Sequence, residues 1–225
     1  MAGPALEARP PEAPRDCPLC PRLVAFREEA RAQWPHWWNG AVPSWGDAGA
    51  RLMVVGLAPG LKGANRTGRP FTGDFAGDLL YGTLKAFGFA EGQFEARPDD
   101  GLRLKDCVVT NAVRCVPPQN KPVGAETAQC RGFLAARLAA TPRLRVVVAL
   151  GRIAHESVVR ALGGRVAAAP FAHGGESAFG GLTLLGSYHC SRYNTNTGRL
   201  TPEMFAAVFA AARRRLDQEG GAAFS

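Results

Sequence analysis

A short apolar strand that runs into a glycine-rich turn determines the architecture of this chain: Leu52-Met53-Val54-Val55-Gly56-Leu57-Ala58-Pro59-Gly60. The turn continues through a second glycine-rich stretch, 63–74. Much later, the apolar run Leu182-Thr183-Leu184-Leu185 precedes the polar segment His189-Cys190-Ser191-Arg192-Tyr193-Asn194. If both strands lie in one parallel sheet, the polar segments meet at its carboxyl edge, where open α/β sheets bind ligands. The spacing therefore predicts an α/β fold with a site at that edge.

Strands and helices alternate along the rest of the chain. Four β-then-α units indicate a three-layer α/β/α sandwich with a central four-stranded parallel sheet and helices on both faces. We expect one domain over 16–219, a disordered lead-in at 1–15 and a tail at 220–225. Apolar runs predict strands at 51–56, 107–112, 144–150 and 182–188, and helical spacing predicts helices at 21–33, 75–87 and 125–140, one ending near 162 and one opening at 201.

Charge and composition indicate the class of partner. The chain has 225 residues, a formal charge of +8 and 23 arginines against 4 lysines. The basic surplus favours a polyanion, and the planar guanidinium suits phosphate contacts, although a GC-rich genome gives the same arginine bias. No stretch approaches the length of a membrane span, and 1–15 has no apolar signal sequence. We therefore expect a cytoplasmic protein that binds nucleic acid and makes no membrane contact.

Four of the six cysteines are spaced as ligands. Cys17 and Cys20 form a C-x2-C knuckle, and Cys115 and Cys130 form a wider pair. Disulfides are rare in the cytoplasm, and four thiolates suit either tetrahedral zinc or an iron–sulfur cluster. The spacing leaves both metals open. We interpret the other two cysteines, at 107 and 190, as buried residues without a ligand role.

The aromatic segment Trp34-Pro35-His36-Trp37-Trp38 has two interpretations. The first, which we prefer, is a packed loop that covers the core. The alternative is a surface that binds a ligand.

Taken together, the motifs resemble the uracil-DNA glycosylase superfamily, most closely its family 5, the type-b enzymes with an iron–sulfur cluster. The resemblance runs from about Cys17 to the carboxyl-terminal helix. It implies a nucleoid-associated enzyme that removes uracil, and other deaminated bases such as hypoxanthine, from double-stranded and single-stranded DNA, leaving an abasic site. For the oligomeric state we take a monomer as the default expectation. It also implies a [4Fe–4S] cluster on Cys17, Cys20, Cys115 and Cys130. The motifs that carry it are Gly56-Leu57-Ala58-Pro59-Gly60, Gly68-Arg69-Pro70-Phe71-Thr72-Gly73-Asp74, Thr110-Asn111-Ala112-Val113-Arg114-Cys115, Asn120-Lys121-Pro122 and His189-Cys190-Ser191.

The resemblance also implies roles for individual residues. His189 donates a hydrogen bond to the uracil oxygen that gains charge, and Phe71 stacks on the base after it leaves the duplex. Asn111 contacts the Watson–Crick edge of the base. The alternative for Asn111 is an asparagine that caps the loop, and the alternative for Phe71 is a core aromatic behind the loop. Asp74 orients water or stabilises the cationic sugar, and its alternative role is to cap the helix that opens at Phe75. The backbone of Gly56, Ala58 and Gly60 borders the base.

DNA contacts are expected outside the base site. Ser191, Arg192, Tyr193 and Asn194 belong to a polar loop that we expect to enter the duplex, and Asn65 and Lys121 are further DNA contacts. Arg131 and the run 213–215 are candidate phosphate contacts, although we interpret the run as a solvated helix face.

One departure from the superfamily leaves rival functions open. Many relatives carry Asp, Asn or Glu just after the first glycine of the first motif to orient the attacking water, whereas this chain has Leu57 and Ala58 there. The rivals are a non-catalytic iron–sulfur protein that binds nucleic acid and an enzyme that acts on free nucleosides or nucleotides. Lys62 is the one lysine in a motif loop, so we expect water to be the nucleophile and the product strand to stay intact.

Overall fold

The computed structural model describes residues 11–221, and the side chains of 11–218. Its central sheet has six strands in the order β1-β5-β2-β6-β8-β7. The four inner strands are parallel, as predicted. The two edge strands are antiparallel and were not predicted, because two and four residues are too few to leave a clear pattern in the sequence. The strands are β1 (Trp45–Gly46), β2 (Leu52–Gly56), β5 (Cys107–Asn111), β6 (Val146–Leu150), β7 (Glu176–Phe179) and β8 (Leu182–Ser187).

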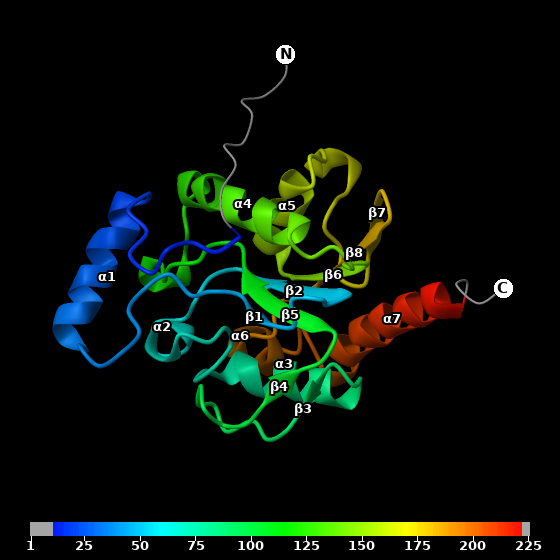
Figure 1. Ribbon diagram of the computed structural model, residues 1–225, viewed down its shortest axis with the longest axis horizontal. Coiled ribbons are helices and arrows are strands. Elements are labelled where there is room, and N and C mark those ends of the chain that lie inside the picture. Colours follow the sequence, from blue (N-terminus) through cyan, green and yellow to red (C-terminus); the bar gives the residue numbers. More distant parts are fainter. Residues whose placement is uncertain (1–10, 222–225) are drawn as a thin grey trace, which may run out of the picture.

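Helices cover both faces of this sheet (Figure 1). Helices α4 (Gly124–Ala139) and α5 (Arg152–Ala161) lie on one face, and α3 (Phe75–Ala86) and α7 (Pro202–Gly221) lie on the other. Side chains of β2 alternate between two cores: Leu52 and Val54 pack with α3 and α7, whereas Met53 and Val55 pack with α4 and α5. Both cores are apolar and buried, and each fully buried aliphatic side chain contributes about 1.5–3 kcal/mol to folding. This burial holds the inner strands, and therefore their carboxyl ends, in place.

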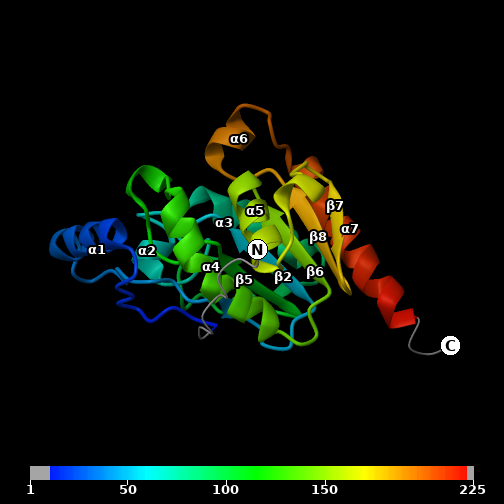
Figure 2. The ribbon, with the colours of Figure 1, turned by 90° about the horizontal axis from the view of Figure 1, so that it is seen from above.

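Helix α1 (Pro21–Gln33) lies at the end of the molecule farthest from α7 (Figure 2). It has the predicted bounds, and its first residue is the proline favoured at the start of a helix. Leu23 packs with Cys17, Val113 and Phe133, which joins α1 to the main domain. No helix in residues 11–221 combines the length and the apolar character needed to cross a membrane.

Residues 11–15 correct the expected disordered lead-in at 1–15. Ala13 is buried, and Glu12 forms ion pairs with Arg114 and Arg137. These contacts place 11–15 against the domain. The rest of the lead-in, 1–10, and residues 222–225 of the expected tail lie outside the described residues.

Short elements complete the fold. The segment after His189 was expected to be a polar loop, but it is a single helical turn whose amino end is capped by the Ser191 hydroxyl. It projects from the body of the molecule (Figure 2). The short elements are α2 (Ala64–Thr67), α6 (Arg192–Asn196), the 3₁₀ turns Pro118–Asn120 and Val166–Ala168, and the small sheet of β3 (Ala90–Glu91) and β4 (Arg103–Leu104).

Candidate active site

Two adjoining cavities open at the carboxyl edge of the sheet. The outer one is a cleft of about 520 Å³, and the inner one is a small pocket of about 30 Å³. Both are lined by Ala58, Gly60, Asp74, Ala76 and His189, so they form one site with an entrance and a deep end. The inner pocket is completed by Pro59, Ala64, Phe71 and Asn111, and the cleft by Leu57, Phe75, Asn120, Ser191 and Arg192.

The deep end is built over Gly56, the last residue of β2. A Cβ atom at Gly56 would collide with the Asn111 amide oxygen and the Phe71 ring, so this position requires glycine. Asn111 ends the neighbouring strand β5, and its Oδ1 is buried with no hydrogen-bond partner among the described residues. Phe71 adopts a left-handed backbone conformation (φ 51°), which is uncommon for a residue with a side chain. The pocket therefore presents an aromatic ring and an amide whose acceptor is free.

Asp74 occupies the N-cap position of α3 without making the capping hydrogen bond. Its carboxylate turns toward Gly60 and Gly63, and its Oδ1 is buried without a hydrogen-bond partner among the described residues. Burial raises the pKa of Asp74, while the amides of Gly77 and Ala76 act in the opposite direction. Asp74 is the single carboxylic acid among the residues lining the two cavities.

His189 follows β8 and lies beside Phe71, with ring centroids 5.9 Å apart. Burial lowers the pKa of His189 to about 4, so its imidazole is neutral at pH 7. Both sides of the residue are tethered: the Asn194 amide donates to the His189 carbonyl at 2.8 Å, and the preceding Tyr188 N–H donates to His173 Nδ1 at 3.0 Å. These bonds hold the backbone on both sides of His189, and its neutral imidazole lines both cavities.

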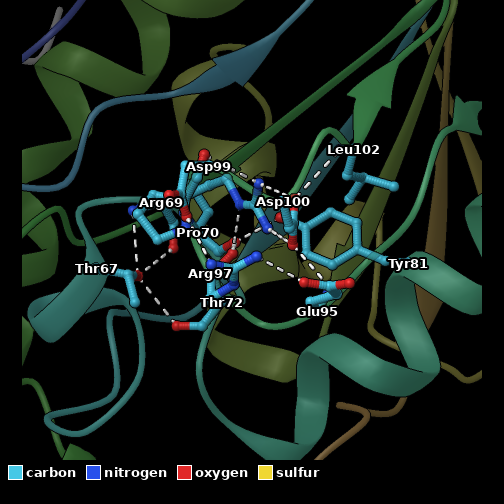
Figure 3. Close-up of polar contacts among 11 residues, drawn as sticks. Thr67, Arg69, Pro70, Thr72, Tyr81, Glu95, Arg97, Asp99, Asp100 and Leu102 are labelled. Carbon is cyan, nitrogen blue, oxygen red and sulfur yellow. Dashed lines mark hydrogen bonds and ion pairs between the residues drawn. The ribbon is translucent and has the colours of Figure 1, made fainter.

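A buried ion pair holds the loop that carries Phe71 and Asp74 (Figure 3). Both Arg69 Nη atoms donate to the Asp100 carboxylate, at 2.8 and 2.7 Å, and Arg69 Nε donates to Thr72 Oγ1. Both charged side chains are almost fully buried. The rings of Trp45, Tyr81 and Phe94 surround the guanidinium. This network fixes residues 69–72 and therefore the direction of Phe71.

The outer cleft contains one polar residue for which no role was predicted from the sequence. Asn120 lines the cleft and has a positive φ of 55° in a proline-rich turn. Its position in the Asn120-Lys121-Pro122 motif was the sequence feature that could have identified it as a site residue. Lys121 is exposed directly after it. Elsewhere in the cleft lining, the Arg192 guanidinium lies over the Phe75 ring, and the neighbouring Tyr193 of α6 is 71% exposed.

Three expected contacts fall elsewhere. Asn65, expected to touch DNA, is fully buried, and its amide donates to Asn39. Arg131 is half-buried on α4 and does not line the cleft. In the run 213–215, Arg213 bonds the Phe87 carbonyl and Arg215 pairs with Glu176. Arg214 and Arg215 are exposed and Arg213 is half-buried, so the preferred interpretation, a solvated helix face, describes only part of the run.

The four spaced cysteines converge on a separate cavity near α1. Cys17, Cys20, Cys115 and Cys130 all line it. Burial and the neighbouring thiols raise the pKa of Cys115 to about 12. The Arg114 amide donates to Cys130 Sγ at 3.3 Å, the kind of contact that supports a ligating sulfur. Four convergent thiols fit a group held by four cysteines, although no three His, Cys, Asp or Glu side chains within 11–218 are arranged around a single metal ion. Cys107 and Cys190 lie in another core.

Comparisons with known proteins agree with this geometry. Residues 43–213 match the model of the uracil DNA glycosylase superfamily. A type-5 uracil-DNA glycosylase of Thermus thermophilus is 49% identical over 204 residues, covering 88% of this chain and 93% of that protein. Its counterpart in Pyrobaculum aerophilum is 42% identical over 197 residues, covering 86% of each chain. That of Mycobacterium tuberculosis is 43% identical over 209 residues, covering 88% of this chain and 77% of the relative.

Proposed function

The chain belongs to the uracil-DNA glycosylase superfamily, and we propose that it is a DNA repair glycosylase that hydrolyses the N-glycosidic bond of uracil in DNA and leaves an abasic site. The observation that carries this proposal is the inner pocket, in which an aromatic ring, an amide, a neutral imidazole and one carboxylate meet at the end of the sheet. These groups match the needs of the reaction: to hold a base, to stabilise charge on it as it leaves, and to assist the sugar.

The size of the site supports a substrate that enters one base at a time. The reacting atoms are inaccessible inside a duplex, so the nucleotide must rotate out, at a cost of a few kcal/mol. The 520 Å³ cleft has room for the nucleotide, and the inner pocket lies behind it. Because a mispaired base costs less to extrude, a U·G pair should be a better substrate than U·A.

Asn111 and Phe71 account for recognition of the base. Phe71 offers a stacking face, and the free Oδ1 of Asn111 is an acceptor for the uracil N3–H, leaving the amide NH₂ to donate to O4. Hypoxanthine presents the same neighbouring pair, an N–H beside a carbonyl. We therefore extend the proposal to hypoxanthine.

His189 acts on the leaving group. A neutral imidazole donates one N–H, and burial excludes water from this one. In such a site, a preorganised donor to a developing anion stabilises the transition state by about 3 kcal/mol or more. The target is the uracil O2. Hypoxanthine has no carbonyl at the corresponding position, so His189 contributes less to its release.

Asp74 serves the sugar side of the reaction. In its ionised form it favours the oxocarbenium-like sugar and accepts a hydrogen bond from the attacking water. Leu57 and Ala58 line the cleft without polar side chains, which leaves this work to Asp74. The free Oδ1 supports this role, while the amides of Ala76 and Gly77, which lower the pKa of Asp74, keep the carboxylate close to the start of α3.

Cys17, Cys20, Cys115 and Cys130 would hold a [4Fe–4S] cluster. When bound, the cluster would supply iron–thiolate bonds that cross-link the segment before α1 to the loop after β5 and to α4. These cysteines do not line the catalytic cavities, so their role is structural.

DNA is held around the cleft by Lys121, Ser191, Arg192, Tyr193 and Asn194, and the enzyme acts as a monomer on double-stranded and single-stranded substrates. Ser191 and Arg192 line the cleft. Tyr193 is the exposed aromatic side chain on the projecting α6, so it is the residue that we expect to fill the space of the extruded base.

One assay tests the function and its rivals. Purified protein is incubated with oligonucleotides carrying U·G, U·A or hypoxanthine·T pairs, with single-stranded uracil DNA and with deoxyuridine, and the released base is quantified. We expect release from the oligonucleotides and none from deoxyuridine. Binding without release would support the non-catalytic rival, and turnover of deoxyuridine would support the nucleoside enzyme.

A further inference from the structure

The aromatic segment between α1 and the sheet forms one wall of a second groove. The groove measures about 490 Å³ and is separate from the two catalytic cavities. Its walls come from the start of the domain, the aromatic segment, α2 and the loop before β4. It is lined by Arg15, His36, Trp37, Trp38, Arg66, Thr67, Ala96, Arg97 and Pro98.

The aromatic wall is rigid. The Trp37 ring stacks on Trp34, with centroids 4.4 Å apart and planes within 6°. Trp38 is tied to α2 through its amide, which donates to the Arg66 carbonyl, and its ring packs against Gly68. The Arg15 guanidinium lies 4.7 Å from the Trp38 ring centroid and donates to the Trp38 carbonyl. A flat ligand would therefore meet an aromatic surface that is already ordered.

The groove is basic. Arg66 and Arg97 are exposed at its rim, together with Arg15. Arg97 pairs with Glu95 and lies near Asp99, whereas no ion pair of Arg15 or Arg66 with a carboxylate occurs within 11–218. Two arginines thus have charge available for an anion. Aromatic faces combined with free arginines are the features that bind single-stranded nucleic acid.

The groove lies on the reverse side of the catalytic loop. Gly60 lines the cleft and Arg66 lines the groove, and six residues span at most about 22 Å. The Arg66 side chain also reaches over Gly73, and Gly73 directly precedes Asp74. Since each base step of DNA rises about 3.4 Å, the groove lies within about six steps of the extruded base.

We propose that this groove binds an unpaired nucleotide in the same DNA strand as the target base, within about six nucleotides of it. The base of this second nucleotide stacks on Trp37, and Arg15 and Arg66 hold its phosphate. This rests on the proposed function, because it assigns a second contact to the same DNA strand. Base faces are covered inside a duplex, so the groove favours single-stranded substrates. It gives the aromatic segment the ligand-binding role that was the alternative in the sequence.

The test compares uracil release from single-stranded and duplex oligonucleotides by native protein and four variants. We expect Trp37→Ala to lower kcat/KM on single strands about ten- to a hundredfold, the effect of losing one base–aromatic stack, with little change on duplex. Trp37→Phe keeps a stacking face and should retain most of the native value. Arg66→Ala should weaken single-strand use and reduce its salt dependence. Arg143→Ala is the matched control, because this exposed arginine precedes β6 at the opposite edge of the sheet.

A second set of measurements varies the substrate instead of the protein. Replacing one base at a time by an abasic spacer, on each side of the uracil, should reveal a position at which native protein and Trp37→Ala become equal. The proposal would be overturned if Trp37→Ala and Arg66→Ala both kept the ratio of kcat/KM on single strands to kcat/KM on duplex that the native protein shows. If native protein released no uracil from any oligonucleotide, the proposed function would fail instead. In that case the affinity for uracil-free single strands, measured by fluorescence anisotropy, tests the groove separately. Weaker binding by Trp37→Ala than by native protein would support the groove, and equal binding would contradict it.

Discussion

The carboxylate of Asp74 occupies the space in which Gly63 would carry a side chain. A residue at the start of a helix ordinarily turns its side chain back onto the amides of the first turn. Here the amides of Ala76 and Gly77 still lower the pKa of Asp74, but the absence of a Cβ atom at Gly63 also lets the carboxylate lie against the loop, at the wall shared by the cleft and the pocket. The glycine-rich loop thus does more than approach a ligand: it makes room for the one acid of the site.

Asp74→Asn should lower the single-turnover rate of uracil release about 10²- to 10⁴-fold, the usual contribution of a positioned acid or base, while stability stays nearly unchanged. The active form is the carboxylate, and burial raises its pKa, so the native rate should rise with pH through the pKa of Asp74. That acidic limb should be absent in Asp74→Asn. Asp78→Asn, one helical turn later and exposed, is the matched control for the rate; its charge also raises the pKa of Asp74, so this variant should keep the acidic limb but move it to lower pH. A native rate in Asp74→Asn would return Asp74 to a structural role.

His189→Ala should slow uracil release about 10²- to 10³-fold and hypoxanthine release distinctly less, because only uracil offers O2 to the imidazole. Since the pKa of His189 is about 4, protonation of this residue should produce no change in rate between about pH 5 and 8. Single-turnover rates with both lesions measure the difference. Equal losses for the two bases would mean that His189 shapes the pocket without acting on the leaving group.

The fold could be predicted from sequence further than the site could. Buried strands such as Val146–Leu150 are continuous apolar runs bounded by glycine and charge, so periodicity located them. Asn65 shows the limit: a polar residue in a polar motif suggested a surface contact, yet the fold buries it against Asn39. Burial of a loop side chain depends on partners distant in the chain, which local pattern does not specify. The segment 192–196 was likewise misjudged, because one capped turn is too short for helical periodicity.

The four clustered cysteines should bind iron. Protein purified without oxygen should be brown, absorb broadly near about 400 nm and contain iron and sulfide. Cys115→Ser should lose the colour and destabilise the fold, because its thiol lines the common cavity. Cys107→Ser and Cys190→Ser are controls that should keep it, since both residues lie in a different core. Stoichiometric zinc in anaerobic preparations would contradict the cluster.

The Arg69–Asp100 pair should be necessary for stability. Asp100→Ala leaves a buried guanidinium without its counter-charge, so we expect a loss of about 3–5 kcal/mol in the free energy of unfolding. Hydrogen bonds from Arg69 hold the pKa of Asp100 well below its usual value, although burial opposes this. The stabilisation is therefore complete above the pKa of an unfolded aspartate, about 3.9, and is lost as the pH falls below it. Urea unfolding from pH 7 to 3 measures both effects. Arg103→Ala, which removes an exposed and solvent-screened pair, should leave the urea midpoint nearly unchanged.

Base release should leave the DNA strand intact. Strand cleavage after base loss needs an amine that forms a Schiff base with the sugar. All four lysines lie in the described chain, and none lines the cleft or the inner pocket; Lys62, in the motif loop, is exposed to solvent. We therefore expect water to be the nucleophile, and labelled products should remain full length until they are treated with alkali or heat. Borohydride should trap no protein–DNA adduct with native protein or with Lys62→Ala. Nicked strands before alkali treatment, together with an adduct that disappears in Lys62→Ala, would show that an amine reaches the sugar after all.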